Sequence, residues 1–149
     1  IILLQKNRWI RLESLAENFP SPILQRSRIK KLQRFLSLPT WDVKVLWFPI
    51  FKAWLENEFK PGDFLYLVID RTQWANVNLL MISLVYNRRA IPIYFTLLGK
   101  LGNTNSQEQK WFLAIVLELL KDYPKVVLGD REFCSVDLAK WLSSHRHTY

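Results

Sequence analysis

The chain has 149 residues, and its 21 Lys and Arg against 13 Asp and Glu give a formal net charge of +8. Hydrophobic residues make up 50% and glycine only four positions, which excludes a disordered, collagen-like or low-complexity chain. No run of about 18 apolar residues indicates a membrane span. One cysteine, Cys134, cannot form an internal disulfide. We therefore expect a soluble, basic, cytoplasmic protein without a membrane partner. Because no Met stands first, we expect the chain to begin inside a longer one.

The first sixty residues carry most of the excess positive charge and show only helical patterns. Helices are predicted at Trp9–Asn18, at Ile23–Ser37 and from Thr40 to Phe59, with Pro49 kinking or dividing the third. In the second helix, Arg26, Lys30 and Arg34 are four residues apart and share a face, opposite Ile29, Leu32 and Leu36. A cationic helix face of this kind suits contact with DNA phosphates. A solvated helix face is the alternative.

A turn at Lys60–Asp63 separates this basic, helical region, residues 1–60, which is a candidate for DNA binding, from residues 61–149, where apolar runs indicate strands. Strands are predicted at Phe64–Asp70, Leu79–Tyr86, Ala90–Leu98 and Lys125–Asp130, and helices at Ser106–Lys121 and Phe133–Ser144. Pro92 places the third strand at an edge or a bulge. Asn105 or Ser106 would cap the first of these helices. The order predicts an α/β (α+β) fold: a mixed sheet with helices packed on it, preceded by the helical region.

Two aspartates carry the functional signal, because each follows an uninterrupted apolar run. Asp70 follows Leu-Val-Ile and Asp130 follows Val-Leu-Gly. The helix between the two strands should make them parallel neighbours, with the hairpin of the other strands on the far side. The two carboxylates would then repel one another unless a cation lies between them. Hard oxygen ligands favour Mg²⁺ or Mn²⁺. The alternative is a pair of strand-terminal aspartates that merely cap turns.

The segments around both aspartates are similar to a known family. Val68–Thr72, then a strand pair and a helix, then Leu128–Phe133, resembles the DDE transposases of bacterial insertion sequences, in the group with a downstream Tyr…Arg…Glu…Lys signature. The resemblance extends to Arg8–Leu15 and Lys31–Leu36. It implies a ribonuclease-H-like catalytic core, incomplete here, behind a DNA-binding region. The implied activity is metal-dependent DNA strand cleavage and strand transfer during transposition.

The same resemblance implies roles for individual residues. Asp70 and Asp130 would be the first two acids of the catalytic triad and would hold Mg²⁺ or Mn²⁺. Arg71 and Arg131 would contact phosphate or position the acids. The third acid, a downstream Glu, is absent, because the sequence stops at Tyr149 and Glu132 lies too close to Asp130 to replace it. The expected partners are the element ends and target DNA, with a homodimer in the DNA complex.

Two other functions compete with a transposase fragment: a different ribonuclease-H-like nuclease, and a truncated, catalytically inactive DNA-binding product. A zinc site at His145 and His147 is disfavoured, because no Cys or carboxylate partner stands at ligand spacing. Cys134 is expected to be a buried structural thiol. For Trp74, packing in the core or at a sheet edge is preferred over stacking on a DNA base.

Overall fold

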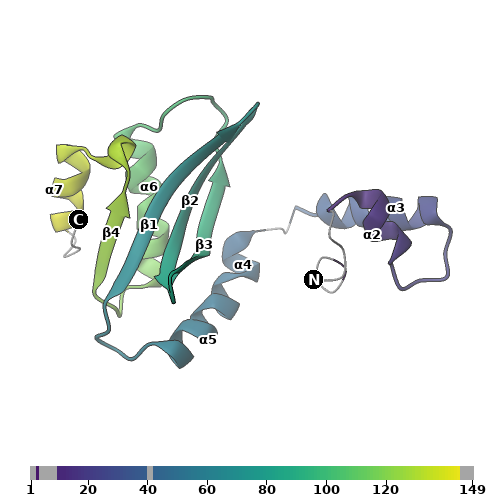
Figure 1. Ribbon diagram of the computed structural model, residues 1–149, viewed down its shortest axis with the longest axis horizontal. Coiled ribbons are helices and arrows are strands. Elements are labelled where there is room, and N and C mark those ends of the chain that lie inside the picture. The colour runs from purple at the N-terminus through teal and green to yellow at the C-terminus, as the bar shows by residue number, and fades with distance from the viewer. Residues whose placement is uncertain (1–2, 4–9, 40–41, 145–149) are drawn as a thin grey trace. The chain divides into compact units, whose positions relative to one another are not determined.

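The computed structural model describes residue 3, residues 10–39 and residues 42–144 (Figure 1). The contacts divide the chain into two compact units, Ile1–Asp42 and Val43–Tyr149. Several sequence predictions lie outside the described residues: the start of the Trp9 helix, the Thr40 cap and the pair of histidines near the C-terminus.

The first unit contains two packed helices, α2 (Leu12–Glu17) and α3 (Gln25–Leu36). Their contact buries Leu15, Ala16 and Leu32, with Ile29 partly buried beside them. Leu36, predicted on the same side of α3 as Ile29 and Leu32, is 61% exposed. The six-residue helix α2 is too short to cover the last turn of α3.

The second unit begins with helices α4 (Val43–Leu46) and α5 (Phe48–Glu58). Pro49 divides the predicted long helix in two and lies in the first turn of α5, where its missing N–H costs no hydrogen bond. Phe51 and Leu55 of α5 are fully buried in the same core as the sheet. The turn predicted at Lys60–Asp63 exists, since the Lys60 amide donates to Asp63 Oδ2 at 2.7 Å. The compact units nevertheless divide at Asp42, not at this turn.

A four-stranded mixed sheet forms the centre of the second unit and confirms the predicted fold class. Its strands are β1 (Leu65–Trp74), β2 (Val77–Tyr86), β3 (Arg89–Leu97) and β4 (Lys125–Gly129), in the order β3-β2-β1-β4. β1 and β2, like β2 and β3, are antiparallel, whereas β1 and β4 are parallel. The hairpin therefore lies on the far side of β1 from β4, as the topological argument predicted. Pro92 lies on the edge strand β3, next to a register shift.

Strand β1 is longer than its apolar run. It continues past Asp70 to Trp74, because residues 71–74 pair with residues 77–80 of β2. The apolar pattern ends earlier because residues 72–74 of β1 are exposed. The prediction that the strand ends at Asp70 is therefore wrong, although the strand pairing that matters for Asp70 is the predicted one.

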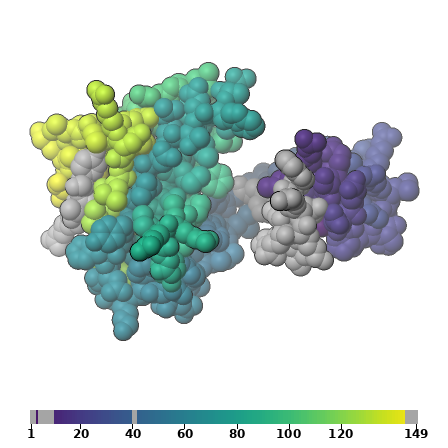
Figure 2. All heavy atoms as spheres, viewed as in Figure 1, coloured from purple at the N-terminus to yellow at the C-terminus, as the bar shows by residue number. Residues whose placement is uncertain are grey.

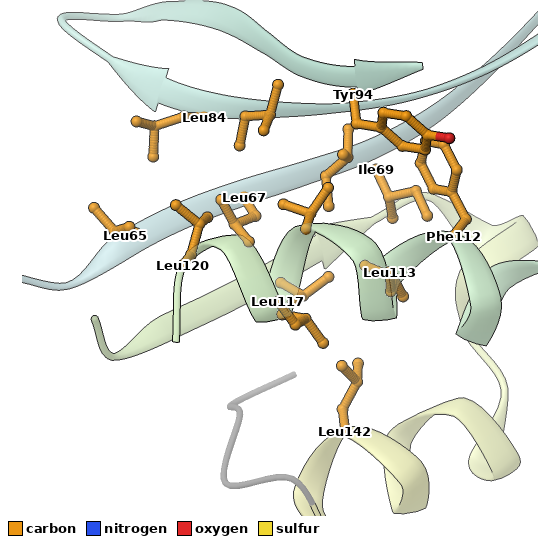
Figure 3. Close-up of a cluster of buried hydrophobic side chains, with 14 of the residues drawn as sticks. Leu65, Leu67, Ile69, Leu84, Tyr94, Phe112, Leu113, Leu117, Leu120 and Leu142 are labelled. Carbon is orange, nitrogen blue, oxygen red and sulfur yellow. The ribbon is translucent and has the colours of Figure 1, made fainter. Parts of the chain in front are cut away.

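Helices cover one face of this sheet. They are α6 (Ser106–Leu119), capped by Asn105 as predicted, and α7 (Val136–Ser144), which follows the short 3-10 helix η1 (Arg131–Phe133). Side chains of β1 and α6 meet in the core between the sheet and the helices (Figure 3). Leu65, Leu67 and Ile69 point into this core, while the alternate residues of β1 face the opposite, exposed side.

Residues of β1 and β2, coloured teal, form part of the surface that faces the viewer in Figure 2. Several large apolar side chains are exposed on the strands: Tyr66, Trp74, Val77, Phe95, Leu97 and Leu128. In the described part of the chain, no helix has the length and apolar character needed to cross a membrane.

Candidate functional site

Asp70 and Asp130 are brought together by the parallel pairing of β1 with β4. The last paired row of these strands joins Ile69 to Gly129, and each aspartate is the next residue of its chain segment. Neighbouring strands lie about 4.8 Å apart, so the two residues leave adjacent positions on the sheet. Both are exposed, and Asp70 lies on the face of β1 opposite the core. The predicted parallel neighbourhood of the two strands is confirmed.

A tight turn after β4 fixes the backbone around Asp130. Asp130 caps the helix η1, because its Oδ1 accepts a hydrogen bond from the Glu132 amide at 2.9 Å. Phe133 is fully buried and anchors the other end of η1. Gly129 leaves room for this ring: a Cβ at Gly129 would lie 2.8 Å from the Cβ of Phe133. The turn-capping alternative and the metal-ligand prediction are thus compatible for Asp130, since the cap uses one carboxylate oxygen.

Directly behind the two aspartates lies an ion pair between their chain neighbours. Arg71 Nε donates to both carboxylate oxygens of Glu132, at 3.0 Å and 2.7 Å. The two side chains are only 15% and 10% exposed. Alternation along β1 places Arg71 on the core side, opposite to Asp70. The pair therefore lies under the site and not among the groups that face outward.

Further polar residues hold this ion pair in place. The Thr104 amide and hydroxyl both donate to Glu132 Oε1 at 2.8 Å. Arg71 Nη1 donates to Asn78 and Nη2 to Asn103. Burial alone would raise the pKa of Glu132, but the hydrogen bonds from Thr104 and Arg71 and the charge of Arg71 together hold that pKa below its ordinary value.

The buried amide of Asn78 ties the loop before α6 to this network. Asn78 is 1% exposed, and its Nδ2 donates to the backbone carbonyls of Lys100 and Gly102 at 2.8 Å and 2.9 Å. The same Asn78 side chain accepts from Arg71 through Oδ1. Residues from β1, β2, the loop before α6 and η1 therefore converge on one polar cluster. We call this set, Arg71, Asn78, Asn103, Thr104 and Glu132, the polar cluster.

The remaining predicted DNA-binding residues lie at the surface. Arg26, Lys30 and Arg34 are exposed on α3, and Arg131 is exposed beside Asp130. Within the described residues, none of these four side chains makes a hydrogen bond or an ion pair. Two other basic residues of α3 do have partners. Arg28 donates to backbone carbonyls of the preceding segment, and the Lys31 ammonium lies 5.5 Å from the centre of the Phe19 ring.

Two predictions about single side chains are wrong. Cys134 is exposed, not buried, because it follows η1 on the outer side and only Phe133 turns into the core. Trp74 is 81% exposed, not packed, because the end of the β1–β2 hairpin extends beyond the helices that cover the sheet.

The polar cluster was not predicted from the sequence, although the sequence pattern indicated a buried charge at Arg71 and a partner at Glu132. Strand alternation places Arg71 on the same face as buried Ile69, where a charged side chain needs a partner. Glu132 is next to the buried Phe133 and is the acid best placed to provide one. The partners from the loop, Asn103 and Thr104, carry no comparable signal in the sequence.

The two aspartates fit part of a ligand set for a hard divalent cation. Their oxygen donors are of the type that Mg²⁺ and Mn²⁺ prefer. Among residues 10–39 and 42–144, no group of three or more His, Cys, Asp or Glu side chains gathers in a way that could hold a metal ion. The described residues thus supply two carboxylates, and further ligands must come from water, substrate or other residues.

Comparison with known proteins gives remote structural likenesses only. No protein-family model and no curated protein matches the chain. Two solved structures of the catalytic domain of Mos1 mariner transposase, one of them with raltegravir and manganese, match it with a TM-score of 0.40 and with 8% and 10% identity. The matches cover 68% of this chain and 55% and 54% of those chains, so the chain spans about half their length.

Proposed function

We propose that this chain is part of a DNA transposase that cleaves DNA strands and transfers them during transposition in a metal-dependent reaction. One observation carries the proposal: two exposed aspartates directly follow the same paired row of two parallel strands. The sequence resemblance around these residues to DDE transposases of insertion sequences supports the same function. The four-stranded order with one parallel edge strand is the arrangement expected for the start of a ribonuclease-H-like core.

Asp70 and Asp130 are the residues that would hold Mg²⁺ or Mn²⁺. A divalent cation at such a site lowers the pKa of water and stabilises the leaving oxygen of a phosphodiester. Arg131, exposed beside Asp130, is available to contact a DNA phosphate. Arg71 is already bound by Glu132, Asn78 and Asn103, which supports the positioning role among its two predicted roles.

DNA affinity is assigned to α3. Arg26, Lys30 and Arg34 are exposed at four-residue spacing on this helix, and the buried Leu32 holds its opposite side against α2. Lysine and arginine on an exposed helix face neutralise phosphates and release counterions. We propose the element ends and target DNA as the partners, in a complex with two copies of the chain.

A second candidate function is a catalytically inactive DNA-binding product. It would use the exposed basic face of α3 and would need no metal at Asp70 and Asp130. A different ribonuclease-H-like nuclease is the other alternative. A reading frame that continues after the Tyr149 codon with a Tyr…Arg…Glu…Lys stretch, inside terminal inverted repeats, would favour the transposase over both.

The metal site is tested by Mn²⁺ binding, measured by the electron paramagnetic resonance signal of free Mn²⁺. We expect weak binding to residues 1–149. Asp70→Asn and Asp130→Asn should each weaken it by more than about tenfold, because losing a ligand costs more than losing a supporting residue. Asp122→Asn, at an exposed acid that precedes β4 whereas Asp130 follows it, is the matched control and should bind like the parent. Unchanged affinity in both site variants would refute the shared site.

A further inference from the structure

Two residues close to the aspartates in the sequence are bound to each other. Arg71 directly follows Asp70, and Glu132 lies two residues after Asp130. Their side chains form an ion pair that bridges β1 and η1, in which the single Nε–H of Arg71 is shared between both carboxylate oxygens of Glu132, at 3.0 Å and 2.7 Å. The other guanidinium nitrogens donate to Asn78 and Asn103, so the direction of the guanidinium is restricted as well as its distance from the carboxylate. The pair therefore fixes the orientation of η1 relative to β1.

The position of Glu132 acts directly on Asp130. The Glu132 amide donates to Asp130 Oδ1 at 2.9 Å, so the backbone at Glu132 determines where this carboxylate points. Thr104 holds the Glu132 carboxylate from the other side through its amide and hydroxyl. A shift of Glu132 would thus move the donor that orients Asp130.

We propose that Arg71 and Glu132 are positioning residues that hold the Asp130 carboxylate beside Asp70 in the orientation that a divalent cation needs. This inference rests on the proposed function, because it assigns the ion pair to that metal site. The ion pair then has a role beyond packing. Its side chains lie on the core side of the sheet, but they influence the orientation of the Asp130 carboxylate on the outer side through the backbone of η1. Supporting residues of this kind set ligand orientation in metal sites.

A readout without metal tests the geometry first. Amide hydrogen exchange, followed by NMR on residues 1–149, reports whether the Glu132 amide keeps its bond to Asp130. We expect exchange at Glu132 to be faster in Arg71→Gln than in the parent, and restored toward the parent in Arg71→Lys, which keeps the charge. Exchange at buried Ile82, in the centre of the sheet, shows whether each variant is folded. Unchanged protection of the Glu132 amide in folded Arg71→Gln would overturn the proposal.

Mn²⁺ affinity provides the second readout, with Glu132→Gln as the test variant. We expect about tenfold weaker binding, the usual effect of losing a supporting residue. Glu108→Gln is the matched control: it removes another ion pair of the same unit, Lys100–Glu108 at 2.8 Å, and should bind Mn²⁺ like the parent. Because Arg71 and Glu132 act as one unit, the double variant Arg71→Gln with Glu132→Gln should bind no more weakly than either single variant.

The two readouts separate failure of this inference from failure of the proposed function. If Asp70→Asn and Asp130→Asn leave Mn²⁺ binding unchanged, the proposed metal site fails, and the inference fails with it whatever the amide exchange shows. If those variants weaken binding but Glu132→Gln does not, the metal site stands and the positioning role is wrong. Additive losses in the double variant would also contradict a single positioning unit.

Discussion

At the scale of single residues, five consecutive positions from the last residue of β4 onward together orient one carboxylate. Gly129 makes room, Asp130 caps the turn, Glu132 binds Arg71, and Phe133 fills the core. Arg131 is exposed, and its side chain makes no hydrogen bond or ion pair with the described residues. A short segment can orient Asp130 this tightly because each neighbour makes a different contact.

Gly129 offers a direct test of this crowding. A Cβ added there would meet Phe133 Cβ at 2.8 Å and Ile69 Cγ2 at 3.1 Å, so Gly129→Ala forces the turn to move. We expect a loss of about 1–3 kcal/mol in unfolding free energy, typical of overpacking, measured by urea denaturation. Gly99→Ala is the control, because no atom lies within 4 Å of its added Cβ and its φ is not positive. Equal stability of the two variants would contradict the crowded turn.

Lys125 gives a pH-dependent prediction. Lys125 is 2% exposed, and burial lowers the pKa of its ammonium group below the ordinary value of 10.5, against a smaller opposing effect of Asp122. At pH values between the pKa of Lys125 in the folded protein and 10.5, the unfolded chain binds more protons at Lys125 than the folded protein does. The free energy of unfolding therefore rises with pH in that range. The melting temperature of the parent should therefore rise relative to Lys125→Met between pH 7 and 9.5.

Thermal melting of both proteins at the two pH values checks this expectation. Tyr86 and Tyr123, whose pKa values are raised, are present in both proteins, so their titration cancels in the difference. A difference in melting temperature that stays constant with pH would show that Lys125 gains no free energy from losing its proton.

At the scale of elements, α3 is the part of the chain whose charge predicts an interaction. The triple variant Arg26→Ala, Lys30→Ala, Arg34→Ala should weaken binding to duplex DNA. It should also lower the slope of log affinity against log salt by roughly 0.9 for each phosphate contact that is lost. The control removes the same charge elsewhere, with Lys52→Ala, Lys121→Ala and Lys140→Ala, all at exposed positions. Fluorescence anisotropy across a salt series measures the affinity and the salt slope of each variant. Equal slopes in the two variants would exclude the α3 face as the DNA-binding surface.

The elements of the sheet unit could be predicted from the sequence to within a few residues, because their apolar runs are long and Pro49 and Asn105 mark helix starts. The extension of β1 to Trp74 could not, since its outer residues are polar and their pairing with β2 leaves no apolar signal. For the candidate site, the closeness of Asp70 and Asp130 along neighbouring strands was predictable from two apolar runs that end in an acid. The polar cluster was not, because Asn103 and Thr104 come from a loop whose path no sequence pattern determines.

At the scale of the whole molecule, the division of the chain determines which fragment folds. Residues 43–58 form helices whose Phe51 and Leu55 are 0% and 1% exposed within the core of the sheet unit. Trp47 also binds the sheet, donating from Nε1 to the Pro92 carbonyl at 3.0 Å. A boundary drawn at the turn near residue 60 would remove these groups from the core, whereas the boundary at Asp42 keeps them.

We therefore expect residues 43–149 to fold alone and residues 61–149 to fail. Burying Phe51 and Leu55 contributes about 1.5–3 kcal/mol each, a large share of the 5–15 kcal/mol that stabilises a typical domain. By circular dichroism, the longer fragment should melt cooperatively near the temperature of the sheet unit in the whole chain, and the shorter should show no cooperative transition. The longer fragment should also lose most DNA affinity, because α3 is absent. A cooperative transition in residues 61–149 would show that α4 and α5 are not part of this folding unit.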